Sequence, residues 1–314
     1  MTTGVTTMEK RGARASRLPE AVLLFVTLIW GVSFLTIQTG MTVSGPLMFQ
    51  ALRYGIATLC LALITGRGMF RVTALEAWVG LFTGLAVALA NGLQAIGLQY
   101  IPSSTSAFLT ALYVPMVPIA QLLFMREMPK PMAWLGILFA FTGMALLAGP
   151  SEILRLAIGP GEIMTLASAA VIAAEIVAIG AFTRRMDSRR VAFVQILVIT
   201  VSTFAATVPA GESLPDPSWL LLATAGGLGL GSVIIHLAMY WAQKRLSPTR
   251  ATLIYATEPV WAGIVGRVAG ERLGLLGVLG ACLIVAGVVI SGLRRGGGDP
   301  KGAAAETTPI PPDH

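Results

Sequence analysis

The chain alternates between long apolar runs and short polar breaks, and this pattern predicts a bundle of membrane-spanning helices. A helix that crosses the hydrocarbon of a bilayer needs about 20 mostly apolar residues. Glycine or proline marks most of the breaks between the runs, as at Pro102, Pro129 and Pro131. Ten runs meet the length requirement: 20–39, 45–65, 75–98, 103–124, 131–149, 160–183, 190–209, 218–242, 249–268 and 273–293. The predicted fold class is an all-α polytopic membrane protein with ten transmembrane helices.

Composition supports lipid as the solvent of this chain. Hydrophobic residues make up 55% of the sequence and charged residues 12%, and the mean hydropathy is +0.78. A soluble domain of this length needs more charge to cover its surface. The two histidines, His236 and His314, and the two cysteines offer no zinc or haem site, and no phosphate-binding G-x-x-x-x-G-K-[ST] motif occurs. We therefore expect no cofactor and no metal.

The positive charges are distributed unevenly between the two ends of the predicted spans. If the amino terminus is cytoplasmic, most Lys and Arg residues fall in cytoplasmic loops, whereas the opposite loops carry chiefly Arg155 and Arg272 with several acidic residues. For a bacterial inner membrane, the location that we expect, this asymmetry follows the positive-inside rule and predicts both termini in the cytoplasm. The net charge of +7 is thus a topological signal, and nucleic acid is not an expected partner. The basic residues on the cytoplasmic side are Arg67, Arg71, Arg126, Lys130, Arg184, Arg185, Arg189, Arg190, Lys244, Arg245, Arg250, Arg294, Arg295 and Lys301.

An internal repeat divides the chain into two similar parts. Residues 103–145 resemble residues 247–289, which lie 144 positions later without a gap. We expect a basic segment at 1–19, which leads into an uncleaved anchor, five-helix repeats at 20–150 and 160–294, and a disordered tail at 295–314. Five spans per repeat is an odd number, so the second repeat enters the membrane from the opposite side. Inverted repeats of this kind favour alternating access around a midplane site, although duplicated bundles also serve as scaffolds.

The two copies carry matching motifs. The first reads Ser103-Ser-Thr-Ser-Ala107, then Pro115 and Arg126-Glu127, and the second reads Ser247-Pro-Thr-Arg-Ala251, then Glu258-Pro259 and Gly270-Glu271. This doubled motif, with Trp30-Gly31 in the first span, resembles the two EamA-type repeats of the drug/metabolite transporter superfamily, from about Glu20 to Leu293. The resemblance implies ten helices, an inverted repeat and efflux of small metabolites. Bacterial members of this family include exporters of aromatic and other amino acids.

Polar and aromatic side chains inside the spans are the candidate substrate-binding residues. A charged group at mid-helix costs about 2.5–3.5 kcal/mol on insertion scales, so such groups normally face a cavity or a partner. Hydrogen bonds between helices are the alternative explanation for each uncharged polar group. The candidates are Trp30, Ser33, Asn91, Gln94, Thr110, Tyr113, Glu175, His236, Tyr240, Glu258 and Trp261.

Glu258 is the sharpest of these candidates. It lies near mid-depth in the ninth span, directly before Pro259, and Trp261 follows one turn later. A carboxyl group there binds a substrate ammonium, carries a proton, or does both. The alternatives are a structural pair with Arg53 or a protonated hydrogen-bond donor.

Weaker candidates lie on other spans. Glu175 lies among alanines, which also suit a protonated acid. Arg53 is a candidate partner for a substrate carboxylate or for an ion pair, or it snorkels toward the interface. His236 and Tyr240 share a helical face, and His236 either titrates in a coupling path or is a hydrogen-bonded packing residue.

These observations predict a secondary transporter that exports small organic solutes, with amino acids as the first substrate class. A multidrug exporter of lipophilic cations is the main alternative, because such cations also need acidic and aromatic residues. An enzyme is not expected, since no nucleophile with an adjacent base appears in the sequence. The expected partners are the small-molecule substrate and the lipid bilayer, and we expect a monomer.

Overall fold

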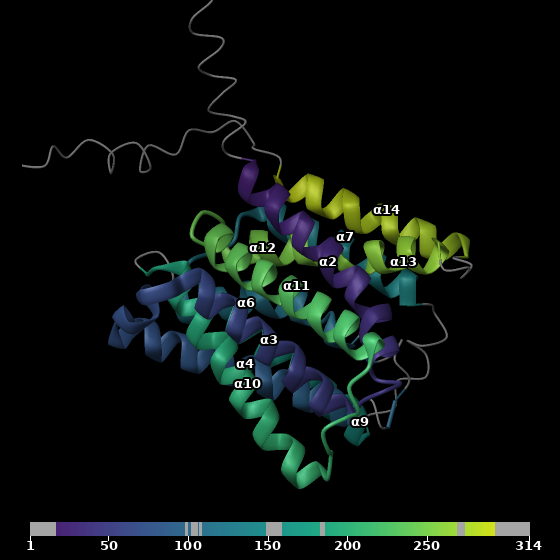
Figure 1. Cartoon of the computed structure of the whole chain (residues 1–314). Coiled ribbons are helices and arrows are strands. Elements are labelled where there is room, and N and C mark those ends of the chain that lie inside the picture. The colour runs from purple at the N-terminus through teal and green to yellow at the C-terminus, as the bar shows by residue number, and fades with distance from the viewer. Residues whose placement is uncertain are drawn as a thin grey trace, which may run out of the picture.

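The computed structural model describes residues 17–97, 100–101, 106, 109–148, 159–182, 186–268 and 274–292. The regular elements of these residues are helices, and no strand occurs among them. In Figure 1, α14 and α7 lie along one side of the bundle and α10 along the other, with α2 and α11 between them. The helices are α2 (Leu18–Gly40), α3 (Pro46–Thr65), α4 (Ala74–Gly97), α6 (Tyr113–Met125), α7 (Pro131–Ala148), α9 (Pro160–Phe182), α10 (Ser188–Ala210), α11 (Trp219–Gln243), α12 (Pro248–Tyr255), α13 (Glu258–Val268) and α14 (Leu275–Gly292), with the 3-10 helix η1 (Gly66–Arg71) after α3.

Most predicted spans coincide with helices to within two or three residues. In the described part of the chain, six helical segments are long and apolar enough to cross a membrane, and three shorter apolar helical segments accompany them. The described part of the chain is therefore all-helical, and its helices suit a membrane protein. The predicted segments 1–19 and 295–314 fall almost wholly outside the described residues.

The fourth and ninth spans differ from the prediction, because neither is one continuous helix. Residues 111–112 form a turn before α6, and residues 256–257 form a turn between α12 and α13. At the second turn, the amide of Thr257 donates to the carbonyl of Ile254, and the amide of Val260 donates to the carbonyl of Thr257. Pro115 and Pro259 follow the turns, and their rings remove the amide donors that a continuous helix needs. The carbonyl of Ala111 instead accepts a turn hydrogen bond from the amide of Val114.

Glycines set the closest helix contacts. A Cβ atom on Gly143 would lie 2.5 Å from the carbonyl oxygen of Gly280, and one on Gly287 would lie 2.5 Å from that of Gly136. Only residues without a side chain allow α7 and α14 to approach this closely, which strengthens van der Waals contact where lipid supplies little hydrophobic drive. The contacts also show that α7 and α14 run antiparallel.

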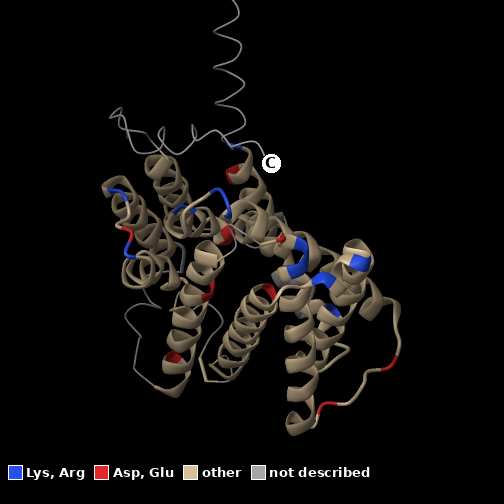
Figure 2. Cartoon of the chain, turned by 90° about the vertical axis from the view of Figure 1, so that its left-hand side faces the viewer, with Lys and Arg blue, Asp and Glu red and all other residues tan. Residues whose placement is uncertain are grey.

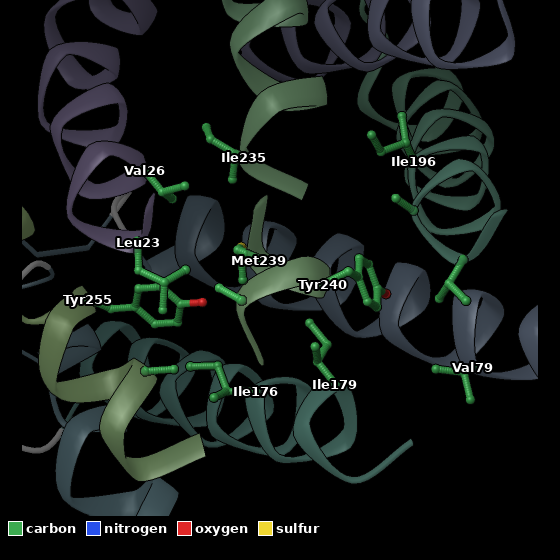
Figure 3. Packing of buried hydrophobic residues seen from close by; sticks show 14 of the residues in the cluster. Leu23, Val26, Val79, Ile176, Ile179, Ile196, Ile235, Met239, Tyr240 and Tyr255 are labelled. Carbon is green, nitrogen blue, oxygen red and sulfur yellow. The ribbon is translucent and has the colours of Figure 1, made fainter. Parts of the chain in front are cut away.

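The buried core joins helices from both parts of the chain. Helix α4 packs against α9 and α10, α11 packs against α2 and α3, and α3 packs against α10. Helix α2 also contacts α13, and α6 contacts α9. Figure 3 shows Tyr255 and Tyr240 on either side of Met239, above Ile176 and Ile179. This core, formed mainly by aliphatic side chains, also holds the phenol groups of Tyr54, Tyr240 and Tyr255.

Charged groups at helix ends connect neighbouring helices. Glu76 accepts hydrogen bonds from the amides of Thr73 and Asp187, at 2.9 Å each, and pairs with Arg190 at 3.2 Å. Arg250 pairs with Glu20 at 2.9 Å and donates to Ser291. Figure 2 shows the Lys and Arg segments in the upper and middle parts of that view, and two red segments in the loop at its lower right.

Candidate functional site

Glu258 is the first residue of α13, at the turn that interrupts the ninth span. Its side chain is half-buried, and no group among the described residues donates a hydrogen bond to its carboxyl. Tyr113, the first residue of α6, lies close enough to interact electrostatically with Glu258 and with Tyr255. The two helix breaks thus bring Glu258 and Tyr113 into one neighbourhood.

Aromatic side chains surround this neighbourhood. The ring centroids of Trp30 and Tyr255 lie 5.2 Å apart with the planes tilted by 59°. The indole nitrogen of Trp261 donates to the hydroxyl of Thr27 at 3.1 Å, and the hydroxyl oxygens of Thr27 and Thr257 lie 3.0 Å apart. Trp30 of α2 and Trp261 of α13 therefore both lie beside the turn that precedes Glu258.

Gln94 and Thr110 are joined directly. The amide nitrogen of Gln94 donates to the hydroxyl of Thr110 at 2.9 Å. For these two candidates the structure therefore shows a hydrogen bond between spans, which was the predicted alternative to substrate binding. Asn91 lies one turn earlier on α4 and is half-buried.

Arg53 and His236 form a separate cluster between α3 and α11. The guanidinium of Arg53 donates to the hydroxyl of Ser232 at 2.9 Å and lies 5.1 Å from the ring centroid of Tyr54. His236 is bonded through Nδ1 to the Ser232 carbonyl at 2.7 Å and contacts Tyr54 edge-on. Among the described residues Arg53 forms no ion pair with Glu258. The predicted alternative, a structural Arg53–Glu258 pair, is therefore absent from this conformation.

Glu175 and Tyr240 lie deeper in the core. The side-chain amide of Gln195 donates to Glu175 at 3.0 Å, and Tyr240 shares a 2.9 Å hydrogen bond with Thr83. Both Tyr240 and Tyr255 interact electrostatically with Glu175. Tyr255 therefore lies between the surroundings of Glu175 and those of Glu258.

Two cavities lie elsewhere on the bundle. Ser33 lines an apolar cavity of about 360 Å³ between α2 and α11. A groove of about 510 Å³ lies among Leu18, Arg189, Trp241 and neighbouring apolar residues. Glu258 lines neither of them, so the predicted cavity around this carboxyl stays a prediction. Among the described side chains, no three His, Cys, Asp or Glu residues gather in a way that suits a metal ion.

Comparison with known proteins decides the family. The EamA-like transporter family matches residues 18–149 and matches again over residues 159–293. The chain belongs to this family. It is therefore a membrane transporter of the EamA type, as the resemblance of the doubled motif predicted.

Its relatives carry transporter names without a stated substrate. An uncharacterized transporter of Archaeoglobus fulgidus is 26% identical over 87% of this chain and 85% of its own length. The uncharacterized inner membrane transporter YedA of Escherichia coli K12 is 28% identical over 87% of this chain and 90% of its own. A crystal structure of another protein, 19% identical in sequence, matches 87% of this chain and 97% of its own with a TM-score of 0.74, which shows a shared fold.

Sequence reasoning missed several residues of the EamA-like bundle that contact the predicted ones. Tyr255 precedes Glu258 by three residues, and Thr27 precedes Trp30 by three, so helical spacing already placed each beside a chosen candidate. Gln195 gave no such signal, because its partner Glu175 lies on another span. The residues missed are Thr27, Tyr54, Thr83, Gln195, Ser232, Tyr255 and Thr257.

Proposed function

We propose that this EamA-like transporter exports small organic solutes, with aromatic or other amino acids as the substrate class, by alternating access between two inverted five-helix repeats. The observation that carries the proposal is the half-buried Glu258 carboxyl at a helix break, beside Tyr113 and without a donor among the described residues. The substrate binds in a cavity at this level of the membrane.

The packing of the helices supports inverted repeats. If α2, α3, α4, α6 and α7 correspond in order to α9, α10, α11, α12–α13 and α14, the observed contacts exchange in pairs. The contact of α4 with α9 becomes that of α11 with α2, the contact of α4 with α10 becomes that of α11 with α3, and the contact of α6 with α9 becomes that of α13 with α2. A two-fold relation between the halves accounts for this pairing.

The glycines of α7 and α14 support the same relation at the level of single residues. The repeat matches Gly136 with Gly280 and Gly143 with Gly287, 144 positions later. Exchanging each residue for its counterpart converts the contact between Gly136 and Gly287 into that between Gly280 and Gly143, and both contacts are observed. Because the paired helices are antiparallel, the relation inverts the two halves across the membrane.

The chemistry near Glu258 favours an amino acid. A carboxylate in a low-dielectric site attracts an ammonium group, and aromatic rings contribute about 0.5–1.5 kcal/mol beyond buried area when they contact a planar side chain. Phosphorylated solutes need several basic groups. Among the described residues, Arg53 is the only Lys or Arg that is buried.

Orientation and assembly belong to the same proposal. The distribution of Lys and Arg supports both termini in the cytoplasm, and the similarity to the inner membrane transporter YedA supports an inner-membrane location. We propose a monomer, because each half already packs against the other within one chain.

Counterflow in proteoliposomes tests the proposal. Vesicles are loaded in turn with each unlabelled amino acid, and uptake of the same labelled amino acid is compared with uptake into protein-free vesicles. Exchange of at least one amino acid, lost in Glu258→Gln and kept in the exposed control Asp216→Asn, supports the proposal. Exchange of a lipophilic cationic dye with no amino acid exchanging identifies a cation exporter instead, and absence of any flux favours a scaffold.

A further inference from the structure

A second buried carboxyl, Glu175, lies away from the break that carries Glu258. It belongs to the middle of α9 and is 6% exposed. Its described hydrogen-bond donor is the side-chain nitrogen of Gln195 on α10, at 3.0 Å. A single neutral donor is a poor substitute for water around an ionised carboxylate, which accepts several hydrogen bonds in solution.

Gln195 has a complementary deficit. Its side chain is fully buried, and its carbonyl oxygen Oε1 has no hydrogen-bond partner. Leaving a buried acceptor without a donor costs free energy, and native proteins contain few such groups. The unpaired oxygen belongs to the same amide whose nitrogen already holds Glu175.

A proton on Glu175 corrects both deficits together. A carboxylic acid is a donor and an acceptor, and a primary amide is an acceptor and a donor. The acid O–H donates to Oε1 of Gln195 while the amide N–H donates to the acid carbonyl, which forms a reciprocal pair. We infer that Glu175 and Gln195 form a proton-binding site of this transporter, distinct from the Glu258 site and independent of the substrate assignment.

The surrounding groups are consistent with a proton as the ligand. The phenols of Tyr240 on α11 and Tyr255 on α12 interact electrostatically with Glu175. Among the described residues no Lys, Arg or His forms an ion pair with it. On the remaining neighbours, the charged and titratable groups interact elsewhere: Glu76 of α4 with Arg190 of α10, Arg250 of α12 with Glu20, His236 of α11 with Ser232, and Tyr113 of α6 with Glu258. A proton taken from water and returned to it is the only reactant that the site needs.

The site also has a route of communication to Glu258. Tyr255 interacts electrostatically with Glu175 and with Tyr113, and Tyr113 interacts with Glu258. The hydroxyl of Tyr255 accepts a hydrogen bond from Gln243 at 3.1 Å, and the carbonyl oxygen of Gln243 is itself buried without a partner. Proton binding at Glu175 thus changes the potential at the phenol of Tyr255, which interacts with Tyr113 in the Glu258 neighbourhood.

Infrared difference spectroscopy of the purified chain in lipid tests this inference without any transported solute. Spectra recorded in acidic buffer minus spectra in alkaline buffer contain the carbonyl stretch of each carboxylic acid that loses its proton. We expect one hydrogen-bonded acid band to vanish in Glu175→Gln and to persist in Glu258→Gln and Asp216→Asn. We expect Gln195→Leu to move the same band to higher frequency, because the acid then lacks its amide partner.

Two results overturn the inference. If the Glu175→Gln spectrum equals that of the wild type, Glu175 binds no proton in this pH range. If Gln195→Leu leaves the band unchanged, the amide does not hold the acid, and this variant keeps the test open should Glu175→Gln fail to fold. Failure of the amino-acid counterflow assay leaves either spectral result standing, so the two proposals fail separately.

Discussion

The two copies of the sequence repeat form the same helix break but place different residues in it. The repeat matches Pro115 with Pro259 and the preceding Val114 with Glu258. Val114 is fully buried and packs with Leu253 and Ile284, whereas Glu258 is half-buried and contacts no described donor. One break is therefore sealed by packing, and the other exposes a carboxyl group. If Glu258 belongs to the transport site, as we propose, then asymmetric substitution at equivalent positions is what distinguishes the two halves of this duplicated scaffold.

The strongest test of this comparison introduces the acidic residue into the sealed break. Val114→Glu leaves a carboxylate among aliphatic side chains, and an uncompensated buried charge costs about 3–5 kcal/mol. We expect a large loss of thermal stability in detergent. The measurement is thermal unfolding, monitored by the fluorescence intensity of a bound reporter dye. Val114→Thr adds only a hydroxyl, for which we expect a loss of about 1–3 kcal/mol. Equal losses in the two variants contradict a sealed first break.

Removing the acidic residue from the second break should affect solute exchange rather than stability. Glu258→Gln keeps the shape of the side chain, so we expect near-normal thermal stability but loss of solute exchange. Truncating one partner of a buried charge pair costs about 2–5 kcal/mol, which corresponds to a reduction of about 30-fold or more in binding of an ammonium substrate. Counterflow measures this reduction, and the same assay is run on Glu175→Gln for comparison. Because exchange needs no net proton movement, Glu175→Gln should keep exchange while accumulation driven by a pH gradient falls.

That division between two carboxyl groups is itself open to disproof. If Glu258→Gln retains exchange while Glu175→Gln abolishes it, the two roles are reversed. If both variants lose exchange and gradient-driven accumulation to the same extent, the groups act as one site. Asp216→Asn, in the exposed loop after α10, should match the wild type in both measurements.

Other equivalent positions should respond alike in the two halves. Gly143→Ala and Gly287→Ala each add a methyl group whose carbon would lie 2.5 Å from a backbone carbonyl oxygen of the opposite helix. Because backbone cannot move aside cheaply, we expect both variants to lose about 1–3 kcal/mol of stability. Gly226→Ala is the control, since nothing lies within 4 Å of its Cβ position. A large loss in one half with none in the other contradicts a two-fold relation at this interface.

Sequence reasoning predicted the spans because lipid imposes a simple requirement on length and polarity. Pro160–Phe182 and Trp219–Gln243 follow directly from their apolar runs. The breaks at 111–112 and 256–257 were less evident, because a proline shows that a helix is weakened but not where the chain turns. The reverse holds for the site. Glu258 could be chosen as a candidate from its depth alone, and its role stays a prediction. The contact of Glu175 with Gln195 depends on the packing of α9 beside the other helices, which no local pattern encodes.

A smaller asymmetry lies where α6 ends and α12 begins. Gln121 accepts hydrogen bonds from the hydroxyl of Thr249 at 2.7 Å and from its backbone amide at 3.2 Å. The counterpart of Gln121, 144 positions later, is Val265, whose side chain cannot form such a bond, so this contact has no equivalent in the exchanged halves. We expect Thr249→Val to cost about 0.5–1.5 kcal/mol, the net contribution of one hydrogen bond, and Thr249→Ser to cost less because it keeps the hydroxyl. Thermal unfolding compares the two variants, and a cost for Thr249→Ser as large as that for Thr249→Val means that methyl packing rather than the hydrogen bond joins the two halves at this end.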